Sequence, residues 1–290
     1  MTHTQRTRIR FMSRLGAVSL LSLGLVAGVS LAPATAAPPV PAPISLGAYI
    51  ALGDSFTAGQ GAPPYLPGDC LQSRDSSYPT LSAAQSPYRT ALNVACSGAD
   101  TADVGLQLTS LDPSVRASAS LVTLTVGGID AGSNQVLANC AQDPAGEACL
   151  NTLAAAVDNL PVVAGKLVGT YQAVGMAMPQ ANIAVLNYPR LFDASLAAPG
   201  SLGFAVNAAT DAINEVIRQA VDVARLTNPR IEYVDVTQEF SRHGIGSRMP
   251  FIAFDPANPT AVANFHPNAR GNLLGYRLAL TFDRVIVRSF

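Results

Sequence analysis

Ser55 is a candidate nucleophile, because it lies in the run Gly53-Asp54-Ser55 directly after a short apolar segment at 46–52. An apolar segment of this length that ends in glycine indicates a buried strand, and we expect a sharp turn from it into a helix beginning near Ser55. At such a turn the serine N–H and the helix N-terminus face developing negative charge. A serine hydroxyl is nevertheless a poor nucleophile unless a base lies within hydrogen-bond reach.

Histidine is the base that proton transfer in enzymes most often uses, and the sequence contains three: His3, His243 and His266. His3 lies in a segment that we expect to be removed on export. His243 stands in a glycine-rich loop and is expected to be a surface or packing residue. His266 precedes Pro267, which as the first residue of a helix would fix the turn that carries the imidazole. The sequence therefore predicts Ser55 and His266 as a catalytic pair.

Alternating strands and helices are expected to position this pair. Besides 46–52, apolar segments typical of strands occur at 91–94, 121–126, 183–186 and 231–236. Patterns typical of helices occur at 150–176, interrupted at Pro161, at 206–226 and at 268–287. Strands that are apolar throughout and alternate with helices favour a parallel sheet covered on both faces. We therefore predict an α/β fold, a three-layer sandwich around a mostly parallel five-stranded sheet, in one domain at 44–290.

The residues that follow the expected strands resemble one family of hydrolases. The run at 49–61, Y-I-A-L-G-D-S-F-T-A-G-Q-G, resembles the first sequence block of the GDSL, or SGNH, hydrolases. The resemblance continues in order with A-C-S-G-A at 95–99, L-T-V-G-G at 124–128 and H-P-N-A-R-G at 266–271. Secreted actinobacterial esterases and lipases of that family are the most similar, and they share S-Y-P at 77–79, Y-P-R-L-F at 188–192 and H-G-I-G-S at 243–247.

The resemblance implies the flavodoxin-like sheet of this family and the hydrolysis of carboxylic esters, lipid esters included, without a cofactor or a metal. It also implies that Ser55 is the nucleophile and His266 the base of a two-step reaction through an acyl-enzyme. Transfer of the acyl group to an alcohol would use the same residues, so the sequence leaves this activity open.

The expected oxyanion hole departs from the family pattern. The family builds it from the serine N–H, a glycine N–H and an asparagine side chain. Ser55 and Gly98 match the first two, whereas Ile129 occupies the asparagine position. Loss of one such donor typically lowers the rate by about 10²–10³-fold. The sequence thus leaves open a slower hydrolase, a replacement donor such as Asn134, or a protein of this fold that binds a lipid or cell-wall ester without cleaving it.

A second departure concerns the group that orients the histidine. The family usually has an aspartate three residues before the histidine, and that position is Ala263 here. Some similar secreted members use a backbone carbonyl, and we expect a main-chain oxygen near Ala263–Asn264 to accept the Nδ1–H of His266. Asp255 is the alternative acid, which would complete a triad.

The N-terminus has the pattern of an export signal. Four arginines precede an uncharged segment at 15–32, and Ala34-Thr35-Ala36 supplies the small residues of a cleavage site. This pattern predicts a signal peptide at 1–36, a flexible Pro/Ala-rich lead-in at 37–43, and a secreted mature chain with no stable membrane insertion. The alternative is an uncleaved anchor, since the eighteen residues 15–32 are just long enough to span a bilayer.

The four cysteines are an even set in a chain predicted to be exported, which favours disulfides. Three connectivities exist for four cysteines. We favour Cys70–Cys96 and Cys140–Cys149, because each closes a short loop in a segment rich in Gly, Pro and Asp. A zinc site is disfavoured, since the sequence has no C-x-x-C pair and no histidine near any cysteine.

The composition narrows the remaining classes of function. Charged residues make up 13 % of the chain and the formal net charge is -1, which excludes a broad basic surface for nucleic acid. Motifs of α/β-hydrolase elbows, zinc proteases, P-loops and dinucleotide-binding folds are missing from the sequence. We therefore expect a secreted, monomeric esterase or lipase whose partner is an ester or lipid substrate.

Overall fold

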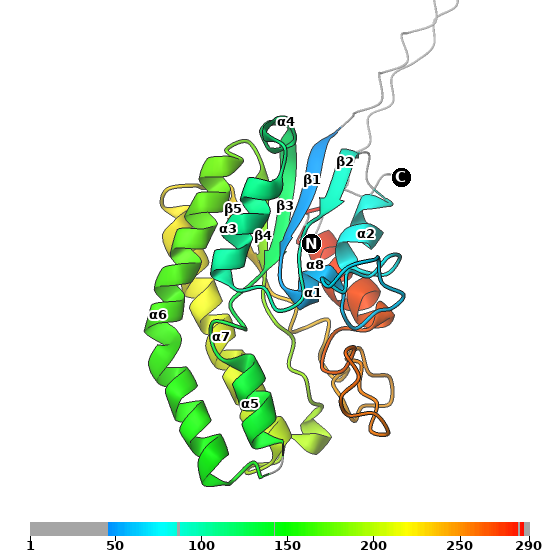
Figure 1. The fold of residues 1–290 in the computed structure, drawn as a ribbon, viewed down its shortest axis with the longest axis vertical. Helices are drawn as coiled ribbons and strands as arrows, with labels where there is room; N and C mark the ends of the chain where they lie inside the picture. The colour runs from blue at the N-terminus through cyan, green and yellow to red at the C-terminus, as the bar shows by residue number, and fades with distance from the viewer. Residues whose placement is uncertain (1–45, 86–87, 142, 284, 287–290) are drawn as a thin grey trace, which may run out of the picture. The chain divides into compact units, whose positions relative to one another are not determined.

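A computed structural model of the chain describes residues 46–85, 88–141, 143–283 and 285–286, and Figure 1 shows it as a ribbon. The predicted signal peptide at 1–36 and lead-in at 37–43 lie outside the described residues, as does the expected end of the last helix at Val287. The described residues all belong to one compact unit.

Five parallel strands form a single sheet in the order β2-β1-β3-β4-β5. The strands are β1 (Leu46–Gly53), β2 (Tyr88–Asn93), β3 (Ala119–Thr125), β4 (Asn182–Leu186) and β5 (Ile231–Val234). The side chains of Ile50, Ala51 and Leu52 are fully buried on alternating faces, which explains why the sequence of β1 is apolar without interruption. The predicted α/β fold with a five-stranded parallel sheet is confirmed.

Helices cover both faces of this sheet (Figure 1). On one face lie α3 (Thr101–Ser110), α6 (Glu147–Ala177) and α7 (Leu202–Arg225), whose buried side chains share a core with β1 and β3. On the other lie α2 (Tyr78–Ala83) and α8 (Arg277–Phe282). The remaining elements are α1 (Ser55–Ala58), α4 (Pro113–Ala117), α5 (Ser133–Cys140), the 3₁₀ turn η1 (Ala194–Leu196) and the π-helical η2 (Gly271–Tyr276).

The predicted interruption of α6 at Pro161 is wrong, because α6 runs without a break from Glu147 to Ala177. Proline deprives the carbonyl four residues earlier, that of Val157, of its helical donor. Pro161 and Val157 are both exposed on the same side of the helix, so water can replace that donor.

The strand order brings the carboxyl ends of β1 and β3 together at a switch point. Sheets with the order 2-1-3-4-5 bind their ligands in the crevice outside such a point. Ser55 follows β1 and Gly128 follows β3, so the fold places both predicted motifs at this crevice. Two long helices also pass beyond this edge of the sheet: Figure 1 shows the N-terminal halves of α6 and α7 projecting past it, with α5 beside them.

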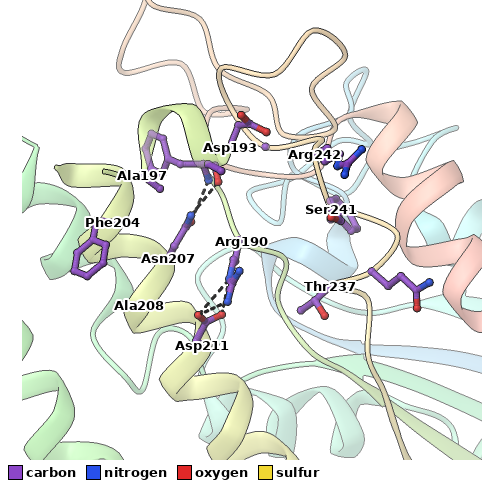
Figure 2. A pocket seen from close by; sticks show the side chains of 15 residues that line it. Arg190, Asp193, Ala197, Phe204, Asn207, Ala208, Asp211, Thr237, Ser241 and Arg242 are labelled. Carbon is purple, nitrogen blue, oxygen red and sulfur yellow. Dashed lines mark hydrogen bonds and ion pairs between the residues drawn. The ribbon is translucent and has the colours of Figure 1, made fainter. Parts of the chain in front are cut away.

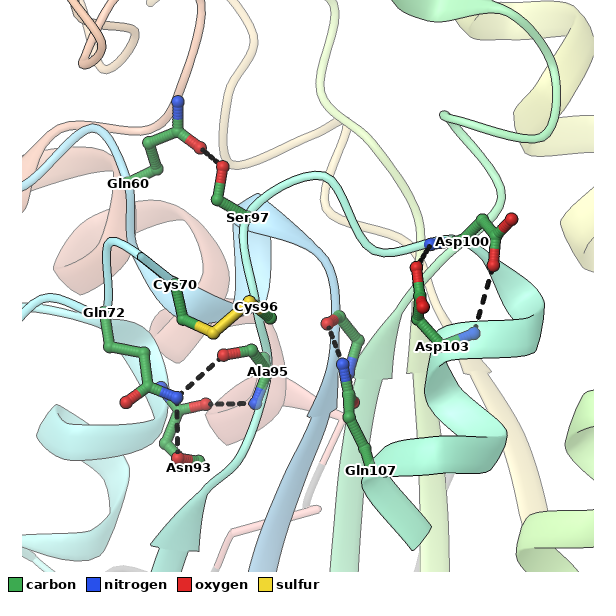
Figure 3. The surroundings of a disulfide bond; sticks show 11 residues. Gln60, Cys70, Gln72, Asn93, Ala95, Cys96, Ser97, Asp100, Asp103 and Gln107 are labelled. Carbon is green, nitrogen blue, oxygen red and sulfur yellow. Dashed lines mark hydrogen bonds between the residues drawn. A yellow bond between two sulfur atoms is a disulfide. The ribbon is translucent and has the colours of Figure 1, made fainter. Parts of the chain in front are cut away.

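Both disulfides that the sequence favours are present, and each holds a connection at this edge. Cys140–Cys149 joins the end of α5 to the start of α6. Cys70–Cys96 joins the loop after α1 to the segment that follows β2, as Figure 3 shows. The bridges therefore fix the loops around the crevice rather than the interior of the sheet.

Candidate active site

Ser55 begins α1 on a tight turn that its neighbours fix. The N–H of Phe56 donates to Asp54 Oδ1 at 2.9 Å, which caps the helix. Gly53 has a φ of 118°, and a Cβ there would lie 2.1 Å from the carbonyl oxygen of Thr125, so the close approach of β1 to β3 requires glycine. Ser55 is buried, with 8 % of its surface exposed.

The structure brings Ser55 and His266 together although 211 residues separate them, with Nε2 of the imidazole 2.8 Å from the serine Oγ. The other ring nitrogen, Nδ1, lies 2.8 Å from the backbone carbonyl oxygen of Asn264. A carbonyl only accepts, so in the neutral ring Nδ1 carries the hydrogen and Nε2 presents its lone pair to the hydroxyl. This is the geometry of a general base.

Burial keeps His266 in the basic form. Desolvation lowers the pKa of His266 from 6.5 to about 4, although the hydrogen bond to the Asn264 carbonyl opposes this shift. Near neutral pH the imidazole is therefore uncharged and able to accept a proton.

The loop that carries His266 is shaped by the Asn264 side chain. Its Oδ1 accepts the N–H of Asp255 at 2.8 Å, and its Nδ2 donates to the carbonyls of Asn258 and Pro259. Asp255 itself is exposed, and its carboxylate accepts the N–H of Ala257. The ring nitrogen thus contacts the Asn264 carbonyl and not Asp255, and the main-chain acceptor expected near Ala263–Asn264 stays a prediction.

Gly61, which sequence reasoning did not single out, lets this loop approach Ser55. A Cβ on Gly61 would lie 2.4 Å from the carbonyl oxygen of Pro267 and 2.5 Å from that of His266. The last glycine of the first sequence block is thus needed for packing against the histidine loop. The remaining candidate base, His243, stacks on Phe251 and bonds the Met249 carbonyl, and it does not line the cavity at Ser55.

The two expected backbone donors are free. Among the hydrogen bonds of the described residues, none is donated by the N–H of Ser55 or of Gly98, and Gly98 adopts a φ of 78° on an exposed turn. The segment around Gly98 is fixed by the bond from Ser97 N–H to the Cys70 carbonyl and by the bond from Ser97 Oγ to Gln60 Oε1, the latter drawn in Figure 3.

Ile129, at the position where the family has asparagine, lies in the structure near the candidate catalytic pair. Ile129 is half-buried and lines the same cavity as Ser55 and His266. Asn134 lines that cavity too, with an exposed side chain. The next residue, Asp130, has a structural role, since its buried carboxylate accepts the N–H and hydroxyl of Thr101 and the ammonium of Lys166.

A buried network that sequence reasoning missed ties the serine turn to the β3 loop. The hydroxyl of Tyr188 donates to Asp54 Oδ2 at 2.5 Å and accepts the N–H of Gly128 at 3.0 Å. Thr125 Oγ1 donates to the other carboxylate oxygen at 2.7 Å. Desolvation raises the pKa of Asp54 from 3.8 to about 6 despite these bonds.

A cavity of about 510 Å³ opens beside the pair, and its walls are largely apolar. A second cavity of about 810 Å³, shown in Figure 2, has both polar and apolar walls and includes the Arg190–Asp211 ion pair and Arg242. Neither Ser55 nor His266 lines this second cavity. Within the part of the chain that the structure describes, no three His, Cys, Asp or Glu side chains are grouped to hold a metal.

Comparison with known proteins points to one family. Residues 51–274 match the model of the GDSL-like Lipase/Acylhydrolase family. The chain is 32 % identical over 266 residues to Lipase 1 of Streptomyces coelicolor, a match covering 89 % of this chain and 94 % of that protein. It is 34 % identical over 239 residues to a lipase of Streptomyces rimosus, covering 79 % and 83 %.

Solved structures agree with these relatives. The crystal structure of the extracellular lipase from Streptomyces rimosus has a TM-score of 0.70 at 32 % identity, covering 81 % of this chain and 99 % of that one. Phospholipase A1 from Streptomyces albidoflavus has a TM-score of 0.73 at 31 % identity, covering 82 % and 99 %.

Proposed function

Because the chain belongs to the GDSL-like lipase/acylhydrolase family and is a carboxylic ester hydrolase, we propose that it cleaves lipid esters with Ser55 as nucleophile and His266 as base. The observation that carries this proposal is the 2.8 Å contact between Ser55 Oγ and His266 Nε2. The lipases and the phospholipase that it resembles support an ester of a fatty acid as the substrate.

The first half of the reaction forms an acyl-enzyme. His266 Nε2 removes the hydroxyl proton while Ser55 Oγ attacks the ester carbonyl carbon. The negative charge that develops on the carbonyl oxygen is stabilised by the free N–H groups of Ser55 and Gly98. The imidazolium then donates its Nε2 proton to the leaving alkoxide, and the alcohol departs.

In the second half, water takes the place of the alcohol. His266 removes a proton from the water, the resulting hydroxide attacks the acyl carbonyl, and Ser55 recovers its proton as the acid leaves. The imidazolium of both steps faces the Asn264 carbonyl, a partial rather than a full negative charge. Ile129 supplies no third oxyanion donor. We therefore expect this chain to hydrolyse esters more slowly than an enzyme with three donors.

We also propose that the mature protein acts outside the cell. Its two disulfides suit an oxidising compartment, and the relative from Streptomyces rimosus is described as extracellular. The N-terminal signal pattern supports the same location.

Ester hydrolysis by the mature chain from Ala37, with chromogenic esters, tests the catalytic proposal. Ser55→Ala and His266→Ala are each expected to lower kcat/KM by about 10⁴-fold or more. His243→Ala is the matched control, because it removes an imidazole that bonds the Met249 carbonyl and does not line the cavity at Ser55, and it should keep the full rate. A folded wild-type chain with no more activity than Ser55→Ala would contradict the proposal and favour an ester-binding protein.

A further inference from the structure

We propose that the side chain of Gln60 is a positioning residue that links two loops of the active site and keeps them at a fixed spacing. One is the segment at 95–100, which carries Gly98 and is called the oxyanion loop below. The other is the histidine loop at 254–266, which ends in His266. The inference rests on the proposed roles of Gly98 and His266 in ester hydrolysis. Gln60 is buried, with 9 % of its surface exposed.

The two ends of the Gln60 amide bond these two loops. Its Oε1 accepts the hydroxyl of Ser97, the residue directly before Gly98, at 2.5 Å, as Figure 3 shows. Its Nε2 donates to the carbonyl oxygen of Val262, four residues before His266, at 2.6 Å. A carbonyl only accepts, whereas a hydroxyl can donate, so this pairing determines which way the amide points. One buried side chain therefore contacts both loops at once.

The bond to Val262 is the anchor of the histidine loop to a distant part of the chain. Among the hydrogen bonds of the described residues, it is the only one that reaches 254–264 from outside 252–268. The Asn264 side chain, by contrast, bonds only members of its own loop. The Asn264 carbonyl lies two residues after Val262 and faces the imidazole of His266. A displacement at Val262 would therefore move the acceptor that the imidazole faces.

On the oxyanion loop, the bond from Ser97 is the side-chain hydrogen bond nearest in sequence to Gly98. Packing does little to fix the direction of the Gly98 N–H, since the residue is exposed and a Cβ on it would have no atom within 4 Å. An error of about 1 Å in the position of a catalytic group can lower a rate by about 10²-fold. The bond to Gln60 therefore bears on how well Gly98 can meet the oxyanion.

Gln60 is itself fixed to the serine turn. Its N–H donates to the Ser55 carbonyl at 3.1 Å, and its own carbonyl accepts the hydroxyl of Tyr65 at 2.5 Å. The next residue, Gly61, packs against the carbonyls of His266 and Pro267. Gln60 therefore holds the two loops in relation to the nucleophile as well as to each other.

Substitution of Gln60 by methionine tests this link, because methionine is of similar length but forms neither bond. Gln60→Met should lower kcat for a short ester by about tenfold or more and leave KM within about twofold, since the lost spacing matters in the transition state. Ser97→Ala removes only the bond on the oxyanion side and should lower kcat less. The double variant should be no slower than Gln60→Met, in which the bond to Ser97 is already missing.

Gln72→Met is the matched control. The Gln72 side chain also makes two bonds, to the carbonyls of Asn93 and Ala95 at 3.0 and 2.7 Å, beside the same disulfide (Figure 3). Within the described part of the chain it bonds no residue of the histidine loop. Gln72→Met should therefore lower the unfolding temperature about as much as Gln60→Met and keep kcat within about twofold.

Equal kcat in Gln60→Met and Gln72→Met would overturn the inference, as would a double variant whose loss is the product of the two single losses. If Gln60→Met does not fold, the half-buried Ser97 keeps the test available, because an unchanged kcat in Ser97→Ala contradicts the inference.

Hydrogen exchange in the Ser55→Ala chain separates the inference from the proposed function. Adding Gln60→Met should speed amide exchange at both 95–100 and 254–266, whereas adding Gln72→Met should leave 254–266 unchanged. This pattern supports the link between the loops even if Ser55→Ala hydrolyses esters as fast as the wild type. Unchanged exchange at 254–266 with Gln60→Met contradicts the link even if Ser55 is the nucleophile.

Discussion

His266 donates its Nδ1–H to the backbone carbonyl of Asn264, 2.8 Å away, and not to a carboxylate. The carbonyl fixes the tautomer and the ring orientation as an aspartate would. It differs in carrying no full charge, so it adds less to the basicity of the imidazole. We therefore propose a Ser–His dyad, with burial keeping the histidine neutral.

Substitution of the alternative acid tests this arrangement. Asp255→Asn should leave kcat within about twofold of the wild-type value, because the Asp255 carboxylate bonds only the N–H of Ala257. Asn264→Ala should lower the rate, since it removes the three side-chain bonds that shape the histidine loop. The measurement is steady-state hydrolysis of a short ester. A loss near 10⁴-fold in Asp255→Asn would indicate a true triad.

The pH at which kcat/KM falls on the acid side should be unusually low for an enzyme with a histidine base. With the pKa of His266 lowered to about 4, kcat/KM should fall with a midpoint nearer to 4 than to the ordinary 6.5. The profile of kcat/KM against pH measures this directly. A midpoint at 6.5 would show that the ring is solvated in the free enzyme.

Stability should change little over the same pH range, because two buried groups oppose each other. The lowered pKa of His266 means that the unfolded chain binds more protons between about 4 and 6.5, so this group adds stability as pH rises. The raised pKa of Asp54 means that the folded chain binds more protons between about 3.8 and 6, so this group removes stability as pH rises. Chemical denaturation at several pH values checks whether activity is lost without unfolding.

Restoring the missing donor should speed the reaction. Ile129→Asn places an amide where the family has one, and kcat for a short ester should rise by about tenfold or more, toward the 10²–10³-fold that one donor is worth. Ile129→Leu is the matched control, since it changes the shape of the cavity wall but adds no donor. An unchanged rate in Ile129→Asn would mean that the oxyanion does not form beside residue 129.

Tyr188 is expected to position the serine turn. Tyr188→Phe leaves the Gly128 N–H without its acceptor and takes one donor from the buried Asp54. The free energy of unfolding should fall by about 1–3 kcal/mol, and kcat should fall with little change in KM. Tyr233→Phe is the control, because the Tyr233 hydroxyl on β5, within the described part of the chain, bonds only the side chain of Asn187, and its loss should leave kcat intact. Equal kcat in the two variants would remove Tyr188 from the positioning network.

The sequence was sufficient for β1, β3 and β4 because each is a largely buried apolar run, as the fully buried Ile50 and Leu52 of β1 illustrate. It placed β2 at 91–94 instead of 88–93, because this edge strand mixes polar and apolar residues and its Ala91 and Leu92 are exposed. It failed at Pro161, where an exposed helix face let solvent replace a lost hydrogen bond. The π-helical turn at Gly271–Tyr276 was also missed; within it, Gly275 packs so closely against the Phe240 ring that a Cβ would lie 2.1 Å from it.

For the site, local motifs predicted residues but not the contacts between distant segments. The residues that flank Ser55 and His266 predicted this pair. Because Ala263 has no side-chain acceptor, the sequence also predicted a main-chain acceptor for His266. The bond from Tyr188 to Asp54 spans 134 residues, and nothing in either segment alone indicates it. The contact of Gly61 with the histidine loop could not be predicted either, because it also joins two distant segments.

Covalent labelling tests the central role of Ser55 most directly. The mature chain would be treated with diethyl p-nitrophenyl phosphate, which transfers its phosphoryl group to an activated serine and releases p-nitrophenolate, and the labelled peptide would be identified by mass spectrometry. We predict one diethylphosphoryl group on Ser55, no label in Ser55→Ala, and strongly slowed labelling in His266→Ala. A label on Ser97 or Ser133 instead, or an equal rate in His266→Ala, would contradict the proposed dyad.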